Sequence, residues 1–340
     1  MDSNFQCFWP AICGGPGAYF AGDTRLLAAE LWHDRPKTSV YRFRVANKRV
    51  AYYFKIYKRE AEYAIAKVEH DTLTALGKLF DDAPGLGVVH PVAYVRELHG
   101  FVSEEFVGTD LSSFFRAAVR RGASAGKMRD GVRVAHRLAV WLQIFQRGEP
   151  PSAGEPYDLS RMHSTARRDL QTALASKMVT ARTAERVREA LDDSRAKLEG
   201  RATTLVPANV DAKLWNFLLG PSGEIRALDF VGIGTGLPTL DVARLWVGLN
   251  WLKVFPHHSR RRVSRLQQEF LRALSPIPDP TELHFHQLCV MTEIAAFYAG
   301  IRSDRYRRKF RNIALFPLIQ RYFDRSLRAL TESHGGGGQS

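Results

Sequence analysis

The chain carries near its centre the stretch Val206-Pro207-Ala208-Asn209-Val210-Asp211-Ala212-Lys213-Leu214-Trp215-Asn216-Phe217-Leu218-Leu219 and, after a turn, Ile225-Arg226-Ala227-Leu228-Asp229-Phe230. Three polar residues, Asp211, Asn216 and Asp229, stand at fixed places among apolar neighbours. The apolar flanks predict a loop that leads into a buried β-hairpin. A carboxylate in such surroundings needs a partner or a metal ion, because burying an unpaired charge is costly. The stretch therefore indicates a chemical site.

The spacing of these residues suits phosphoryl transfer. That reaction needs one carboxylate to orient the attacking hydroxyl, and oxygen ligands for magnesium from two adjacent chain segments. The pattern Asp-x-x-x-x-Asn followed by Leu-Asp-Phe resembles the kinase superfamily, whose catalytic loop reads His-x-Asp-x-x-x-x-Asn. The resemblance implies that Asp211 is the catalytic aspartate and that Asn216 and Asp229 hold Mg²⁺. It also implies that Lys213 steadies the transferred phosphate, with a simple surface lysine as the alternative.

The N-terminal part of the chain contains a second pair of candidate residues. Alternating β-forming residues over 39–57 predict a hairpin, and apolar spacing over 60–80 predicts a helix. A kinase needs a strand lysine to hold the α- and β-phosphates of ATP and a helix glutamate to hold that lysine. Lys55 and Glu69 match these roles, since Glu69 opens a Glu-x-x-x-Leu-x-x-Leu pattern that resembles aminoglycoside and choline phosphotransferases. Glu62 is a rival, two helical turns earlier on nearly the same face.

Two further segments resemble the same small-molecule kinases. Residues 101–111 resemble their hinge, which implies that backbone groups of Glu105, Phe106 and Val107 meet the adenine. Residues 236–243 resemble the segment after the metal-binding aspartate, which implies that Asp241 braces the catalytic loop. The resemblance spans residues 38–245 and involves five motifs in the right order.

The sequence also departs from the kinase pattern. Asn209 stands where the catalytic loop usually has His. The phosphate-covering loop is expected around 35–39 and lacks glycine, so that Lys37, Thr38 and Ser39 would bind the phosphates. We interpret 232–236 as a flexible loop, because the spacing of a dinucleotide-binding loop is absent. These departures leave a catalytically degenerate, kinase-like binding module as an alternative.

Together these patterns predict an α+β, two-lobed protein-kinase-like fold, with a small mixed β/α N-lobe and a mainly helical C-lobe. We expect an N-terminal extension over 1–37, the N-lobe over 38–108, the C-lobe over 109–331 and a flexible tail over 332–340. In the extension, Pro10 and the following glycines argue against a helix. Helical periodicity is found over 111–121, 131–146, 160–198, 240–254, 263–274 and 281–301.

The charge of the chain indicates its partners. There are 49 Lys and Arg against 35 Asp and Glu, a formal net charge of +14. Such a field attracts polyanions or an anionic membrane surface. The excess lies partly in 260–272 and partly in 302–311. The three cysteines form no C-x-x-C pair and no apolar run is long enough to span a bilayer, so we expect a cytoplasmic protein with peripheral contact at the inner face of the membrane.

The resemblance implies an ATP:alcohol phosphotransferase that uses ATP and Mg²⁺. Arginine clusters in the C-lobe oppose a cationic acceptor and favour an anionic one. Kinases of lipopolysaccharide core sugars share this fold, and residues 216–219 resemble their loop. We therefore expect a sugar of an anionic glycan or glycolipid as the acceptor. The alternatives are a soluble antibiotic or metabolite kinase and the binding module, for which a nucleic acid partner is the less favoured choice.

Overall fold

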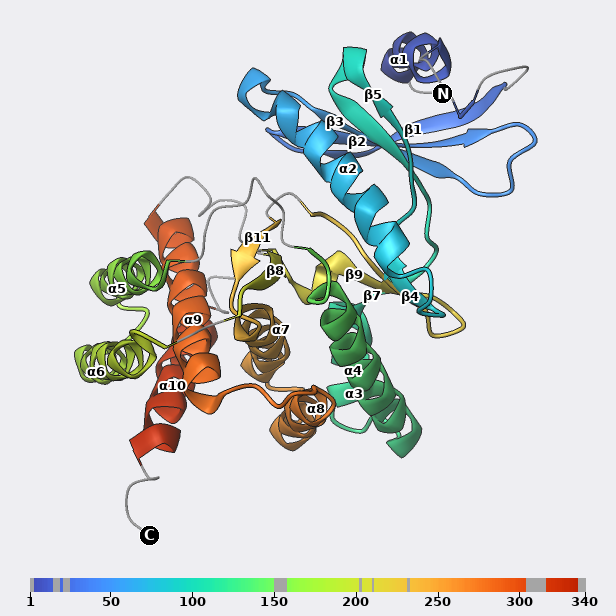
Figure 1. The fold of residues 1–340 in the computed structure, drawn as a ribbon. Helices are drawn as coiled ribbons and strands as arrows, with labels where there is room; N and C mark the ends of the chain where they lie inside the picture. The colour runs from blue at the N-terminus through green and yellow to red at the C-terminus, as the bar shows by residue number, and fades with distance from the viewer. Residues whose placement is uncertain are drawn as a thin grey trace. The chain divides into compact units, whose positions relative to one another are not determined.

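The computed structural model describes residues 3–14, 19–20, 25–149, 158–201, 204–209, 211–230, 233–303 and 316–335. The chain divides into two compact units: an N-terminal unit of residues 1–111 with 215–232, and a helical unit of residues 112–214 with 233–340 (Figure 1). The predicted α+β fold class is confirmed. The basic residues at 305–311 and the end of the expected tail, 336–340, lie outside the described residues.

The N-terminal unit contains an antiparallel sheet in the order β1-β2-β3-β6-β5. Its strands are β1 (Leu26–Asp34), β2 (Thr38–Val45), β3 (Tyr52–Tyr57), β5 (Pro91–Val95) and β6 (Gly100–Glu104). The predicted hairpin is β2–β3, and Asn47 in its turn has the left-handed φ of 64° that Asn tolerates. Helix α2 (Tyr63–Leu79) follows the short 3₁₀ helix η1 (Glu60–Glu62) and packs on this sheet (Figure 1). The predicted strand–strand–helix order is confirmed.

Helix α1 (Ser3–Gly14) covers the other face of the sheet, where we expected a separate extension without a helix. Its Phe5 is fully buried against Phe43 and Phe54. Because side chains alternate along a strand, Phe54 faces α1 while its neighbour Lys55 faces α2. The helix contains Pro10, which costs about 3 kcal/mol in a helix interior. Burial of several aromatic side chains offsets that cost, so the expectation from Pro10 was wrong.

A second, smaller sheet of the N-terminal unit carries the central hairpin. Its order is β4-β10-β9-β7, with β4 (Leu86–Val88), β10 (Ile225–Ala227), β9 (Phe217–Leu219) and β7 (Thr109–Asp110). Strand β10 pairs parallel with β4 and antiparallel with β9. The apolar run over 88–95 is therefore divided between the two sheets, because β4 ends at Val88 and β5 begins at Pro91. The 3₁₀ helices η2 (Arg96–Leu98) and η3 (Leu214–Asn216) precede β6 and β9.

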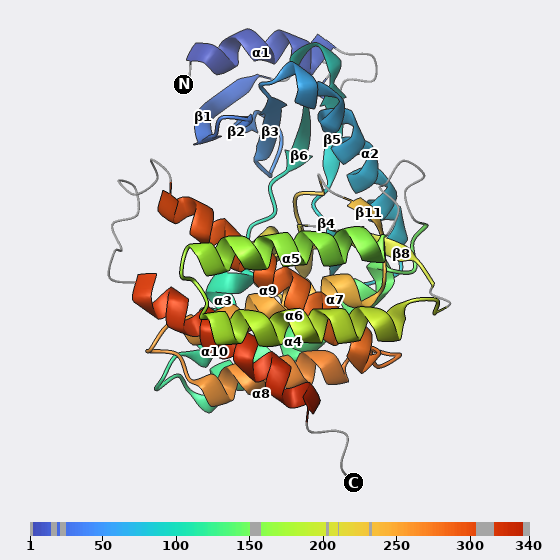
Figure 2. The same cartoon turned by 90° about the vertical axis from the view of Figure 1, so that its left-hand side faces the viewer.

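The helical unit is built on buried contacts among α5, α6, α7, α9 and α10. Its elements are α3 (Leu111–Val119), α4 (Ala125–Phe145), α5 (Leu159–Ala175), α6 (Ala181–Leu198), α7 (Thr239–Trp251), the 3₁₀ helix η4 (Leu252–Val254), α8 (Arg260–Arg272), α9 (Pro280–Ser303) and α10 (Phe316–Gly335). Figure 2 shows α5 and α6 side by side, packed against α9. The single helix expected over 160–198 is thus two helices, and Lys177 between them has a positive φ of 59°. Helix α10 was not predicted.

A two-stranded ladder in the helical unit corrects the interpretation of 232–236 as a loop. Strand β11 (Ile233–Gly236) pairs antiparallel with β8 (Val206–Asn209). A Cβ at Gly236 would lie 2.9 Å from the Cβ of Ala208. Glycine is therefore required there by the close approach of the two strands.

Candidate active site

Three charged side chains of the N-terminal unit meet at one point. The Nζ atom of Lys55 lies 2.9 and 2.8 Å from the two carboxylate oxygens of Glu69 and 3.1 Å from Oδ1 of Asp229. Lys55 comes from β3, Glu69 from α2, and Asp229 from the residues just after β10. The structure thus joins residues 174 positions apart in sequence. Lys55 contacts Glu69 rather than the rival Glu62, whose partner is Lys37 at 2.9 Å.

Burial shifts the pKa values of the charged groups in this cluster. The side chain of Glu69 is only 2% exposed. Burial alone would lower the pKa of Lys55, but attraction to Glu69 and Asp229 outweighs it and raises the pKa. Burial raises the pKa of the Glu69 carboxyl, and the ammonium of Lys55 opposes that shift. The ammonium group is therefore held charged at a fixed position on the sheet.

Tyr57 completes this cluster and was missed in the sequence. Its hydroxyl donates a 2.6 Å hydrogen bond to Oε2 of Glu69. Tyr57 lies two residues after Lys55 on the same face of β3, and this period-two spacing was the available signal. With Lys55 on both oxygens of Glu69 and Tyr57 on one of them, the carboxylate is well satisfied despite its burial.

The hairpin β9–β10 places Asn216 opposite Leu228, the residue before Asp229. The register pairs Phe217 with Ala227, and the N–H of Leu228 donates to the carbonyl oxygen of Asn216 at 2.7 Å. Asp229 has a φ of 59°, the left-handed region that non-glycine residues rarely adopt. Such strain is retained where the surroundings fix it, and it is concentrated at functional sites. Asn216 is buried, whereas the Asp229 side chain is 38% exposed.

The helical unit holds Asp211 through a chain of hydrogen bonds. The backbone N–H of Asn209 donates to both oxygens of the fully buried Asp241, at 2.9 and 3.2 Å. The side-chain oxygen of Asn209 in turn accepts the N–H of Asp211 at 3.0 Å. Asn209 therefore links Asp241 to the loop that carries Asp211. Burial raises the pKa of Asp241 to about 7, opposed by the hydrogen bonds from Asn209.

Lys213 lies directly beside Asp211 within the same unit. Its ammonium forms an ion pair with Oδ1 of Asp211, and its backbone N–H donates to the carbonyl of Asp211 at 2.7 Å. Both side chains are partly exposed, at 42% for Lys213 and 32% for Asp211. A small-molecule ligand therefore has access to both groups.

The expected phosphate-covering loop is the connection between β1 and β2. The N–H of Arg35 donates to the carbonyl of Thr38 at 2.9 Å, which closes the turn. The Ser39 hydroxyl donates to Oδ1 of Asp34 at 2.6 Å, so its single proton is already used. The side chain of Lys37 is 66% exposed and forms an ion pair with Glu62. Of the three residues expected to bind phosphate, Ser39 is thus engaged with Asp34 and Lys37 with Glu62.

The expected hinge lies between β6 and β7. The N–H of Glu105 donates to the carbonyl of Ala51 at 2.8 Å, and its carboxylate binds Arg42 at 2.7 and 3.0 Å. Within the described residues, the backbone groups of Phe106 and Val107 form no hydrogen bond with other protein groups. Free donors and acceptors of this kind can bind the edge of a planar heterocycle.

No group of three or more His, Cys, Asp and Glu side chains converges as a metal site within the described residues. None of the described helices combines the length and the apolar character needed to cross a membrane.

No family model and no curated protein matches the sequence. Solved structures do resemble it. A thermostable mutant of the aminoglycoside phosphotransferase APH(4)-Ia has a TM-score of 0.56 at 12% identity, covering 92% of this chain and 96% of that one. The spectinomycin phosphotransferase APH(9)-Ia, in complex with ADP and spectinomycin, has a TM-score of 0.54 at 12% identity over 91% and 93%. The choline kinase LicA from Streptococcus pneumoniae has a TM-score of 0.52 at 12% identity over 91% and 94%.

At these identities the likeness concerns the fold. The chain has the two-lobed protein-kinase-like fold of the aminoglycoside and choline phosphotransferases, as the sequence predicted.

Proposed function

We propose that the protein is an ATP- and Mg²⁺-dependent phosphotransferase that acts on a hydroxyl group. The observation that carries this proposal is the contact of Lys55 with both Glu69 and Asp229. A partly buried lysine held by one carboxylate, next to a second carboxylate that is partly exposed, suits the binding of nucleotide phosphates and a cation. The free backbone groups at Phe106 and Val107 support adenine binding beside it.

The donor set fits magnesium. Mg²⁺ takes oxygen ligands, keeps several waters and uses one or two carboxylates together with substrate phosphates. Asp229 and Asn216 supply one carboxylate and one amide oxygen from the base of a single hairpin. The absence of a larger cluster among the described residues agrees with this sparse coordination. When bound, the ion would neutralise charge on the β- and γ-phosphates.

The roles of the other residues follow from their positions. Lys55, fixed by Glu69 and Tyr57, would bind the α- and β-phosphates. Asp211, oriented through Asn209, would accept the hydrogen bond of the acceptor hydroxyl and take its proton. Lys213, next to it, would stabilise the negative charge of the moving phosphoryl group.

For the acceptor we propose a sugar hydroxyl of an anionic glycan or glycolipid, such as the core of a lipopolysaccharide. Support comes from the net charge of +14 and from helix α8, whose exposed Arg260, Arg261, Arg265 and Arg272 face solvent. A basic surface would also attract anionic lipid, with each nearby Lys or Arg adding about 1 kcal/mol. A free antibiotic or metabolite is the second candidate, favoured by the spectinomycin bound to one structural neighbour.

A transfer assay tests the proposal. Wild-type protein is incubated with [γ-³²P]ATP, Mg²⁺ and separate pools of phosphorylated glycolipids in detergent and of soluble aminoglycosides and sugars. We expect label transfer to a glycolipid that disappears with EDTA and in Asp211→Asn. Transfer only to a soluble compound would replace the acceptor proposal. No transfer to any pool, with no binding of ATP, would favour the degenerate binding module.

A further inference from the structure

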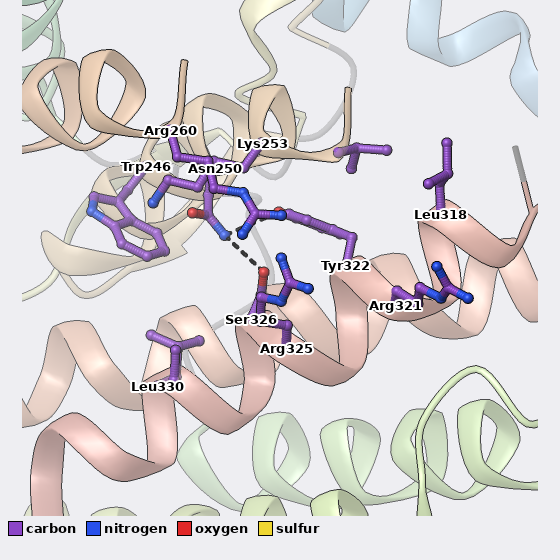
Figure 3. Close-up of a pocket in the computed structure, with 12 residues that line it drawn as sticks. Trp246, Asn250, Lys253, Arg260, Leu318, Arg321, Tyr322, Arg325, Ser326 and Leu330 are labelled. Carbon is purple, nitrogen blue, oxygen red and sulfur yellow. Dashed lines mark hydrogen bonds between the residues drawn. The ribbon is translucent and has the colours of Figure 1, made fainter. Parts of the chain in front are cut away.

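The helical unit contains a pocket that the proposed phosphoryl transfer does not use. Its volume is about 450 Å³, within the range of small-ligand sites. One wall comes from α7, η4 and the first residue of α8, and the other from α10 (Figure 3). None of its lining residues belongs to the segment 211–230 that holds the residues assigned to catalysis and metal binding.

The charges of this pocket are all of one sign. Lys253 and Arg260 line one wall, and Arg321 and Arg325 line the other. None of the described lining residues carries a carboxylate, and no described Asp or Glu forms an ion pair with any of the four. The described partner of the Lys253 ammonium is the side-chain oxygen of Gln267, at 2.8 Å. Burial, with a smaller effect from Arg260, lowers the pKa of Lys253 to about 8.

Arg321 and Arg325 are arranged to act together. They stand four residues apart on α10 and so lie on one face of that helix. Both are exposed, which leaves their guanidinium groups free to bind a ligand. Planar guanidinium groups bind phosphate and carboxylate oxygens in bidentate geometry.

The floor of the pocket is polar and ordered. The side-chain amide of Asn250 donates to the hydroxyl of Tyr322 at 3.0 Å and to that of Ser326 at 3.4 Å (Figure 3). Trp246 and Leu330 add apolar surface beside these groups. A ligand with charged groups and a compact organic body would match both kinds of surface.

We propose that this pocket binds a small organic anion with at least two negative charges, of the diphosphate or bisphosphate class, at a site separate from the residues assigned to phosphoryl transfer. Four cations without a counter-charge repel each other, and an anion between the two walls would remove that repulsion. The proposal does not depend on the proposed phosphoryl transfer, since it uses none of the residues assigned to the nucleotide, the metal ion or catalysis. Arg260 is the one residue that it shares with the basic surface of α8.

Calorimetric titration with inorganic pyrophosphate, without Mg²⁺ and at low salt, tests the site. The pocket variant is Arg321→Gln/Arg325→Gln. The matched control is Arg129→Gln/Arg182→Gln, which removes the same charge from exposed arginines of the helical unit that do not line the pocket. Both variants keep the residues assigned to the nucleotide, so any pyrophosphate bound there contributes equally to the two.

We expect at least a tenfold loss of affinity in the pocket variant and less than a twofold change in the control. No binding by the wild type, or equal affinities for the two variants, would overturn the proposal. Flotation with phosphatidylcholine vesicles, with and without phosphatidic acid, then identifies the source of the anion. Vesicle binding that needs phosphatidic acid and is lost in the pocket variant indicates a lipid headgroup. Pyrophosphate binding without flotation indicates a soluble ligand, and either result keeps the site assigned.

Discussion

Charged side chains are arranged in opposite ways in the two units. In the N-terminal unit, Lys55 is enclosed by Glu69 and Asp229, so that its charge is compensated by the protein itself. In the helical unit, Lys253 shares a pocket with arginines and has no described acidic partner. In the N-terminal unit, the protein's own carboxylates fix the lysine, and removal of either one would disturb the cluster. In the helical unit, a bound anion would have to supply the compensating negative charge.

The largest expected effect is the loss of phosphoryl transfer when Asp211 is replaced, because the residues assigned to ATP binding remain in place. Asp211→Ala should reduce phosphoryl transfer by about 10²–10⁴-fold, because it removes the group that takes the proton of the hydroxyl. ATP binding should persist, since Lys55 and Asp229 belong to the other unit. Turnover and ATP affinity of the purified variant measure both effects. A control is Asp193→Ala on the exposed face of α6, where Asp193 pairs with Lys197. Normal turnover of Asp211→Ala would remove the catalytic role of this residue.

Breaking the compensated cluster should cost stability. Glu69→Ala leaves the partly buried Lys55 with Asp229 as its acidic partner, and loss of hydrogen bonds to a charged group costs about 1.5–3 kcal/mol of unfolding free energy. Asp71→Ala is the matched control on the same helix, because Asp71 and its partner Lys67 are both more than half exposed and such pairs contribute less than about 1 kcal/mol. Urea denaturation of both variants gives the difference. Equal losses would show that the Lys55–Glu69 contact is not the special one.

Removing a charge from the pocket of the helical unit should increase the unfolding free energy, whereas Glu69→Ala should decrease it. Lys253→Met should raise the unfolding free energy at pH 7 by about 1–2 kcal/mol, because burial lowers the pKa of Lys253 to about 8 from 10.5. Lys253→Met also loses the hydrogen bond to Gln267, so the gain in unfolding free energy is smaller than the pKa shift alone would give.

The gain in unfolding free energy from Lys253→Met should also depend on pH. Between about pH 8 and 10.5 the unfolded chain binds the Lys253 proton and the folded one does not. The contribution of Lys253 to the unfolding free energy therefore rises with pH over this range, and the gain from Lys253→Met should shrink accordingly. Denaturation of both proteins at pH 7 and at pH 9.5 measures this change. A gain that is constant with pH would contradict the uncompensated state of the pocket.

The elements that could be predicted from the sequence are those in which buried and exposed residues recur at the period of a strand or a helix. The β2–β3 hairpin and α2 were found from their apolar spacing, and Lys55 and Glu69 were singled out on them. Strand β1 was missed because most of its residues are exposed, so its sequence carries no inward–outward alternation. Helix α1 was missed because burial of Phe5 against the sheet outweighs the local cost of Pro10.

The residues of the candidate site were identified from motifs, whereas their contacts required the structure. Local sequence could not show that Lys55 selects Glu69 over Glu62, since both glutamates lie near one helix face. The substitute for the usual His was recognised at Asn209. Its side-chain oxygen accepts the N–H of Asp211 nearby, whereas the hydrogen bond that its own N–H donates to Asp241 joins segments 32 residues apart. The basic pocket was missed because α10, which supplies one of its walls, was not predicted.

The central claim, a nucleotide and magnesium site built on Lys55 and Asp229, is tested most directly by thermal unfolding with ATP and Mg²⁺. The wild type should show a rise in melting temperature with millimolar ATP that requires Mg²⁺, because a ligand that binds only the folded state stabilises it. Asp229→Ala should fold but lose that rise, since the Asp229 side chain is partly exposed. No Mg²⁺-dependent rise in the wild type, or the same rise in Asp229→Ala, would contradict the account.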